Sequence, residues 1–406
     1  MARLVQKFGG TSVADVDRIK IVAERVKREV VAGNEVLVVV SAMSGTTNQL
    51  VAWTNAVGEM PDPCEYDAVV ASGEQVTAGL LAIALQQIGV KARSWLGWQV
   101  AIHTDDAHGK ARIQQIDMSE IRRRAEEGEV AVVAGFQGVD DNGRITTLGR
   151  GGSDTSAVAL AAAFEAERCD IFTDVDGVYT TDPRIVTRAR KLDRITYEEM
   201  LELASQGAKV LQTRSVEVAM NHRVRVQVLS SFVDLPGTMV VDEDEILEQQ
   251  VVSGIAYSRD EAKVTVAGVS DRPGIAAAIF GPLADAGINV DMIVQNVSRD
   301  GKATDMTFTV GKTDLAHARQ VLDANRSSFP CDEISASSDV VKISVIGVGM
   351  RSHAGVAQKM FRTLAEKGIN IQVISTSEIK VAVLIAEEYL ELALRALHTA
   401  YGLDAA

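Results

Sequence analysis

Apolar runs alternate with helical repeats of apolar residues along roughly the first 240 residues of the chain. The N-terminal run ARLVQKF predicts a strand. The apolar positions that follow step by three and four residues, as in an amphipathic helix: Val16, Ile19, Ala23, Val26 and Val30. Ser12 and Asp15 have the spacing of a capping box at the start of this helix, and Gly33 lies just past its end. The next run, EVLVVVSA, is typical of a strand buried on both faces.

The same alternation continues further along the chain. Further strands are predicted at EVAVVAGFQG, DIFTDVDGV and VRVQVLSS, and helices at SAVALAAAFEAE and EEMLELASQGAKVL. Strands that alternate with helices indicate an α/β domain whose mostly parallel sheet is covered by helices and joined by right-handed crossovers. We assign this first domain to residues 1–245.

An internal repeat occupies the C-terminal part of the chain, beyond an acidic stretch at residues 242–252. GIAAAIFGPLADAGINV (274–290) aligns without a gap with GVAQKMFRTLAEKGINI (355–371). Each copy follows one apolar strand and precedes another, which predicts two βαββαβ modules of the ferredoxin-like type. We place their boundaries at residues 252–335 and 336–406.

Composition narrows the class of protein. The net charge of −14 argues against a nucleic-acid partner or an anionic membrane, both of which favour a basic face. The chain shows no N-terminal leader pattern and no apolar run near the ~18 residues of a spanning helix. Its three cysteines are odd in number and far apart, so we expect free thiols and a cytoplasmic location.

Two glycine-rich turns are candidate anion sites. In QKFGGTS, Lys7 precedes Gly9 and Gly10, so the motif is neither the phosphate loop of nucleotide hydrolases nor the dinucleotide fingerprint. In GRGGSDTSA, a glycine turn leads into an alanine-rich helix, and Arg150 adds a fork suited to a carboxylate or a phosphate. The alternative for the second turn is an ordinary tight turn with Ser153 as the helix cap.

Carboxylates follow a third predicted strand. In FTDVDGVYTTDPR, Asp174, Asp176 and Asp182 could hold Mg²⁺ through water, and Tyr179 offers a flat face to a base. An acidic surface turn is the alternative. No Ser/His/Asp or Cys/His grouping stands out. Anion cradles and scattered carboxylates without an evident base fit phosphoryl transfer, where catalysis is mainly positioning and charge neutralisation.

Six motifs, taken in order, resemble one family: KFGGTS, VVSAMSGTTN, SGE, GRGGSDTSA, TDVDGVYTTDPR and GAKVL. They are similar to those of the aspartate kinases of the amino acid kinase superfamily, and the repeat resembles the paired ACT domains that regulate them. The resemblance implies ATP-dependent phosphorylation of the β-carboxylate of L-aspartate to 4-phospho-L-aspartate. That reaction is the first step towards lysine, threonine, methionine and diaminopimelate.

The resemblance also implies roles for individual residues. Lys7, Asp154 and Lys209 would be catalytic, with Asp154 orienting Lys7. The aspartate pocket would be formed by Ser41, Thr47, Glu74, Arg150 and Ser153. ATP would be bound by Lys7, Phe8, Gly9, Gly10, Thr173, Asp174, Tyr179, Asp182, Pro183, Arg184 and Lys209, and Mg²⁺ would accompany it. After GAKVL this chain has Gln212 and Thr213 where some members have His-Pro.

Feedback effectors, lysine or threonine or both, would bind at the ACT modules. The candidate residues are Asp271, Ile275, Asn289, Asp291, Met292, Ile293 and Gln295 in the first copy, and Asn370, Ile371 and Thr376 in the second. For the apolar ones a core role is the alternative. We expect a homo-oligomer formed through the ACT domains, or a complex with a shorter regulatory chain. Two other functions compete: an amino acid kinase for another substrate, and an amino-acid sensor with an inactive kinase fold.

Overall fold

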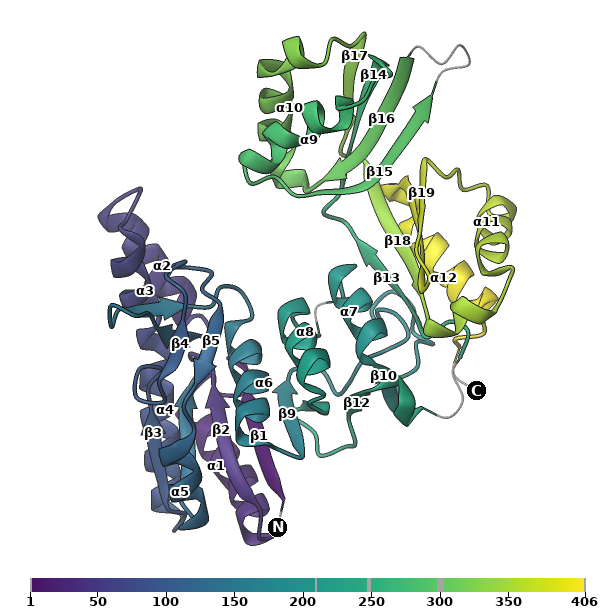
Figure 1. The fold of residues 1–406 in the computed structure, drawn as a ribbon. Helices are drawn as coiled ribbons and strands as arrows, with labels where there is room; N and C mark the ends of the chain where they lie inside the picture. The colour runs from purple at the N-terminus through teal and green to yellow at the C-terminus, as the bar shows by residue number, and fades with distance from the viewer. Residues whose placement is uncertain (1, 209, 247–249, 298–302, 405–406) are drawn as a thin grey trace. The chain divides into compact units, whose positions relative to one another are not determined.

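The computed structural model describes residues 2–208, 210–246, 250–297 and 303–404. They form two compact units (Figure 1). The first unit consists of Met1–Val178, Lys191–Ala204 and Lys209–Glu248, and the second of Tyr179–Arg190, Ser205–Ala208 and Gln249–Ala406. The short segments 179–190 and 205–208 therefore belong to the second unit. The sequence instead predicts a single boundary at residue 245, with both segments in the first domain.

An eight-stranded sheet forms the centre of the first unit. Its strands, in spatial order, are β10 (Arg194–Thr196), β12 (Thr238–Val241), β11 (Val226–Ser230), β9 (Arg168–Thr173), β1 (Arg3–Phe8), β2 (Glu35–Val40), β6 (Val130–Ala134) and β3 (Ala92–Trp95). Only the β11–β12 pair is antiparallel. The predicted mostly parallel sheet is confirmed.

Helices cover both faces of this sheet. Alternate strand residues such as Val38 and Val132 pack with α1 (Val16–Val31) and α4 (Ser72–Gln87) in one apolar cluster. The intervening residues point to the opposite face, where α6 (Gly152–Phe164) packs on β1 and β2 with α8 (Thr213–His222) beside it. The remaining helices of this unit are α2 (Thr46–Val57), α3 (Pro63–Val70), α5 (Ser119–Glu126) and α7 (Tyr197–Ser205).

The start of α1 corrects one local prediction. Asp15 caps the helix by accepting a hydrogen bond from the Arg18 N–H at 2.8 Å. Ser12 takes no part in the cap, because its buried hydroxyl donates to the Phe172 carbonyl at 3.3 Å instead. Ser12 and Asp15 therefore do not form a capping box. Asp15 alone caps α1, and Ser12 contacts β9.

A small sheet lies beside the large one in the first unit. It contains β5 (Ile113–Ile116), β4 (Ile102–Thr104), β7 (Gln137–Val139) and β8 (Ile145–Thr147). The nearby α3–α4 stretch, residues 63–87, is long and apolar enough to span a membrane by length and composition alone, contrary to the expectation of no such run. Half of its apolar window is buried inside the protein, as in the core helix of a globular domain.

The first ACT-like module of the second unit has the predicted βαββαβ order. The elements are β14 (Ala262–Ser270), α9 (Ile275–Asp285), β15 (Val290–Val297), β16 (Ala303–Val310), α10 (Leu315–Ala324) and β17 (Glu333–Ser337). Its four strands form one antiparallel sheet in the order β15-β16-β14-β17. Both helices contribute to a single apolar core with that sheet.

The second module completes its sheet with a strand from before the first module. Its elements are β18 (Val340–Ile346), α11 (Val356–Glu366), β19 (Val373–Thr376), β20 (Lys380–Ala386) and α12 (Leu390–Ala400). The fourth strand is β13 (Gly254–Ser258), which pairs antiparallel with β18. The expected boundary at residue 252 grouped β13 with the first module, because local periodicity does not reveal a pairing partner so distant in sequence.

Candidate active site

A cavity of about 710 Å³ opens where β1, β2 and β9 end at their carboxyl edge. This edge is where parallel α/β sheets bind ligands. Most of the predicted substrate and phosphate residues line it: Lys7, Gly9, Gly10, Ser41, Thr47, Glu74, Arg150, Ser153, Asp154, Thr173 and Asp174. The structure therefore brings together residues as far apart in the chain as Lys7 and Asp174.

Lys7 and Asp154 form a buried ion pair at the base of this cavity. The Lys7 Nζ lies 2.5 Å from Asp154 Oδ1, and both residues are only 8% exposed. Lys7 comes from the end of β1 and Asp154 from the first turn of α6. The carboxylate holds the ammonium group beside the Gly9–Gly10 turn, and the orienting role of Asp154 remains a prediction.

Two glycines allow the backbone to approach this site. A Cβ on Gly9 would lie 3.3 Å from the Lys7 Nζ and would crowd it. Gly151 has a φ of +71°, and a Cβ there would overlap the Gln212 side chain. The turn before α6 therefore needs glycine for its conformation and for its closeness to α8.

Glu74 projects from α4 into the cavity and is almost fully buried. Its Oε1 accepts a hydrogen bond from the Ala42 N–H at 3.0 Å, whereas Oε2 has no partner in the described part of the chain. Burial raises the pKa of this carboxyl from 4.5 to about 7. A cationic ligand group at Oε2 would restore the charged form.

Arg150 is the exposed cation of the same wall. Among the residues that the structure describes, no carboxylate forms an ion pair with its guanidinium group. Ser153 is buried in the first turn of α6, and Ser41 and Thr47 lie half-buried at the end of β2 and the start of α2. The cavity thus presents the Glu74 carboxyl and the Arg150 guanidinium group beside polar hydroxyls.

The expected nucleotide residues are divided between the two units. Thr173 and Asp174 line the cavity at the end of β9. Phe8 does not line it: its ring is fully buried and stacks on Phe172 at 4.7 Å, so only its backbone is near the turn. Lys209 lies outside the described residues.

The TTDPR segment is described with the second unit. Asp182 accepts hydrogen bonds from the Arg184 N–H and guanidinium and from the Tyr257 hydroxyl, and these bonds lower its pKa. Tyr179 and Pro183 also lie in the part of the second unit formed by Tyr179–Arg190. The interpretation of this segment as a nucleotide-binding element remains a prediction.

Sequence reasoning missed several residues that line the cavity. Tyr66 of α3, Gly109, Phe136, Thr147 and Gln212 come from separate elements and carry no local motif. Gln212 was noted only as a departure from the family pattern. The side chain of Gln212 lies against Gly151, so the residue that departs from the family pattern forms part of the cavity wall.

The predicted effector residues fall into three environments in the second unit. Ile275 and Met292 are buried, the former in the first module's core and the latter against the second module's sheet. Asp291 forms an ion pair with the buried Lys342 at 2.7 Å. The others are half-buried or exposed: Asp271, Asn289, Ile293, Gln295, Asn370, Ile371 and Thr376.

Comparisons with known proteins agree with this architecture. The amino acid kinase family matches residues 2–230, and two ACT domain models match residues 263–326 and 343–401. The aspartokinase of Pseudomonas aeruginosa is 58% identical over 407 aligned residues, covering 100% of this chain and 98% of that protein.

Solved structures give the same result. Aspartokinase III of E. coli in complex with aspartate and ADP superposes with a TM-score of 0.83 at 28% identity, covering 98% of this chain and 99% of that one. The same enzyme with lysine and aspartate gives a TM-score of 0.76 at 28% identity, covering 98% of each chain. The chain therefore belongs to the aspartate kinases, with an amino acid kinase domain followed by two ACT domains.

Proposed function

We propose that the cavity holds L-aspartate between Glu74 and Arg150 while Lys7 neutralises the phosphoryl group that is transferred to the β-carboxylate. The partnerless Oε2 of Glu74 carries this proposal, because a buried carboxylate oxygen calls for a cation such as the substrate ammonium. Arg150 would take the α-carboxylate through a forked pair of hydrogen bonds. This two-ended clamp would leave the β-carboxylate facing Lys7.

The reaction needs no general base from the protein. The β-carboxylate of aspartate has an ordinary pKa of ~3.9 and is ionised at neutral pH. The difficulty is instead to bring this anion against the polyanionic triphosphate. Lys7 and the backbone N–H groups of the Gly9–Gly10 turn would reduce that repulsion. We assign Lys209 to the phosphates on the family resemblance alone.

The carboxylates of the cavity are compatible with Mg²⁺ that arrives with ATP. No group of three metal-ligating side chains occurs in the described residues. Mg²⁺ usually takes one or two carboxylates together with substrate phosphates, and the exposed Asp174 could supply such a ligand. When bound, the ion would neutralise charge on the phosphates.

We further infer feedback by lysine, threonine or both through the ACT modules, in a homo-oligomer and in the cytoplasm. The structure of E. coli aspartokinase III with lysine and aspartate supports an amino-acid effector. The free thiols of Cys64, Cys169 and Cys331 are compatible with a reducing compartment. The product of the reaction would then be used for the synthesis of lysine, threonine, methionine and diaminopimelate.

The clamp can be tested with substrate analogues that each lack one end. Succinate lacks the amine and β-alanine lacks the α-carboxylate, so each should be phosphorylated at least about 100-fold less efficiently than aspartate. Glu74→Gln should lose most of the discrimination between aspartate and succinate but keep that against β-alanine. If Glu74→Gln discriminates against succinate as strongly as the wild type, Glu74 does not bind the amine.

A further inference from the structure

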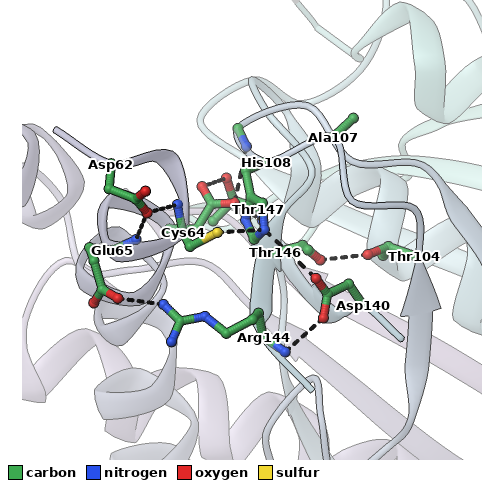
Figure 2. A network of polar contacts seen from close by, with 12 residues as sticks. Asp62, Cys64, Glu65, Thr104, Ala107, His108, Asp140, Arg144, Thr146 and Thr147 are labelled. Atoms are coloured by element: carbon green, nitrogen blue, oxygen red, sulfur yellow. Dashed lines mark hydrogen bonds and ion pairs between the residues drawn. The ribbon is translucent and has the colours of Figure 1, made fainter. Parts of the chain in front are cut away.

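A cysteine, a histidine and an aspartate are joined by polar contacts, and Figure 2 shows the cysteine and the histidine. The Cys64 Sγ is 3.1 Å from His108 Nε2, and His108 Nδ1 is 2.9 Å from Asp67 Oδ2. Cys64 and Asp67 belong to α3, and His108 lies between β4 and β5. No Cys/His grouping is evident from the sequence, because the histidine is 44 residues from the cysteine.

The hydrogen bonds fix the state of the histidine. Asp67 is fully buried and also accepts from the Gly109 N–H at 3.0 Å, the Thr147 N–H at 2.9 Å and the Thr147 hydroxyl at 2.6 Å. Because Asp67 Oδ2 acts as an acceptor in these hydrogen bonds, His108 Nδ1 is the donor in its contact with Oδ2 and carries the ring proton. The Nε2 lone pair then faces the Cys64 sulfur, which is the arrangement of a nucleophile, its base and an orienting carboxylate.

The surroundings of Cys64 disfavour its thiolate form, so the thiol needs a base in order to react as a nucleophile. Burial raises the pKa of the Cys64 thiol, and the neighbouring Asp62 carboxylate adds to the effect, while Arg144 opposes it. Asp140 Oδ2 lies 3.8 Å from His108 Nε2, and Arg144 is partly neutralised by Glu65 at 2.6 Å. The thiol therefore holds its proton at neutral pH until a base removes it, and it is half-exposed to reagents.

We propose that Cys64 is a thiol modification site that exchanges with low-molecular-weight disulfides, with His108 as its general base. As the sulfur attacks one atom of the disulfide, its proton passes to His108 Nε2. The Cys64–sulfur bond forms, the disulfide bond of the reagent breaks, and the other half leaves as a thiolate that recovers the proton. The disulfide is reduced as Cys64 is oxidised, and a small thiol reverses the reaction.

The same contacts connect Cys64 with the substrate cavity, on the proposed function described above. Gly109 and Thr147, which donate to Asp67, both line the cavity. In the mixed disulfide the sulfur has no proton to donate to Nε2, so His108 loses this hydrogen bond and its contact with Asp67 is disturbed. Modification should therefore raise the KM for aspartate more than it lowers kcat.

The first test uses the full chain and oxidised glutathione, with mixed disulfides counted by peptide mass spectrometry. Cys331 is the internal control, because it is also half-exposed and its sulfur has no histidine partner among the residues described. Cys64 should react about tenfold faster than Cys331. Equal rates at the two cysteines would overturn the proposal.

Two variants test the base and the connection. His108→Asn, checked for an unchanged melting temperature, should lower the Cys64 rate to that of Cys331; if it does not fold, the ratio of the two rates in the wild type decides. After complete modification the KM for aspartate should rise about threefold or more in the wild type and stay constant in Cys64→Ser. An unchanged KM would refute the connection to the cavity. A lack of aspartate turnover in the unmodified enzyme would instead contradict the proposed function.

Discussion

Lys7 and Asp154 contribute differently to stability and to catalysis, although they form one buried pair. Lys7→Met would leave the Asp154 carboxylate buried and unpaired, which costs about 3 kcal/mol of unfolding free energy. It should also lower kcat about 1,000-fold through loss of a charge beside the phosphoryl group. The double variant Lys7→Met/Asp154→Asn should regain most of the melting temperature and none of the activity.

Comparison of the single and double variants separates the effect of Lys7 on stability from its effect on catalysis. Melting curves report stability and ADP release reports catalysis on the same preparations. If the double variant recovers activity together with stability, Lys7 acts by maintaining the fold and not by neutralising the phosphoryl group.

The Glu74 carboxyl gives a prediction about pH. Its pKa is about 7 in the folded chain and 4.5 ordinarily, so the folded state binds more protons than the unfolded state between these values. The unfolding free energy should therefore fall as pH rises through this window, by up to about 3 kcal/mol. Glu74→Gln should remove this dependence, as measured by melting temperature across the pH range.

Aspartate should reverse the effect of burial on Glu74. Its ammonium group favours the ionised carboxylate, so binding near pH 6.5 should release a proton in the wild type and none in Glu74→Gln. Calorimetry in buffers of different ionisation enthalpy measures this release. Proton release of the same size in both proteins would assign it to another group.

At the scale of elements, the turn before α6 depends on Gly151. Gly151→Ala would both strain a positive φ and collide with Gln212, whereas Gly143→Ala has the same strain at φ +74° with open space around it. The strain alone costs about 1–2 kcal/mol. We expect Gly151→Ala to raise the KM for aspartate about tenfold or more, and Gly143→Ala to leave it near the wild-type value.

A second change can distinguish collision from strain. Gln212→Gly removes every colliding side-chain atom, so the variant Gly151→Ala/Gln212→Gly should recover part of the KM. If Gly143→Ala and Gly151→Ala behave alike, the closeness of Gly151 to Gln212 has no importance for the cavity.

The sequence predicts local elements better than their partners. The β1–α1–β2 order and the repeat of 274–290 in 355–371 follow from apolar periodicity and are confirmed by the structure. EVAVVAGFQG was predicted as one strand, but Phe136, with φ +70°, divides it into β6 and β7, which join different sheets. The pairing of β13 with β18 depends on tertiary packing across the inserted module, which periodicity cannot reveal.

Prediction of the site residues was likewise limited to residues that lie in local motifs. Lys7, Arg150 and Asp154 lie in motifs with local chemistry, so the sequence could single them out. Tyr66 and Thr147 line the cavity only because α3 and β8 are brought beside it. The partnerless oxygen of Glu74 is also a property of the packed structure, since a glutamate in a first helical turn is usually a cap.

At the scale of the whole molecule, the two ACT modules meet through β15. Met292, with φ +48°, lies at an irregularity of this strand and packs on the second module's sheet, next to the Asp291–Lys342 ion pair. A strand that packs on both modules is a suitable place for an effector to select one of two arrangements. We therefore expect effector contacts near Gln295 and Thr376, in the strands β15 and β19.

Alanine variants test these contacts. Gln295→Ala and Thr376→Ala should each raise the effector concentration for half inhibition about tenfold, with uninhibited turnover near wild type. Thr363→Ala, at a half-buried position of α11, is the matched control and should be inhibited as strongly as the wild type. Unchanged inhibition in both test variants would show that the effector binds elsewhere.

The most direct test of the whole account is ADP release with Mg-ATP and L-aspartate, with L-glutamate as the comparison substrate, repeated with lysine, threonine and both. The account predicts turnover that requires aspartate, is much weaker with glutamate, and is suppressed by at least one of the end products. No turnover, together with a rise in melting temperature on adding lysine or threonine, would contradict it. The chain would then be a sensor with a silent kinase fold.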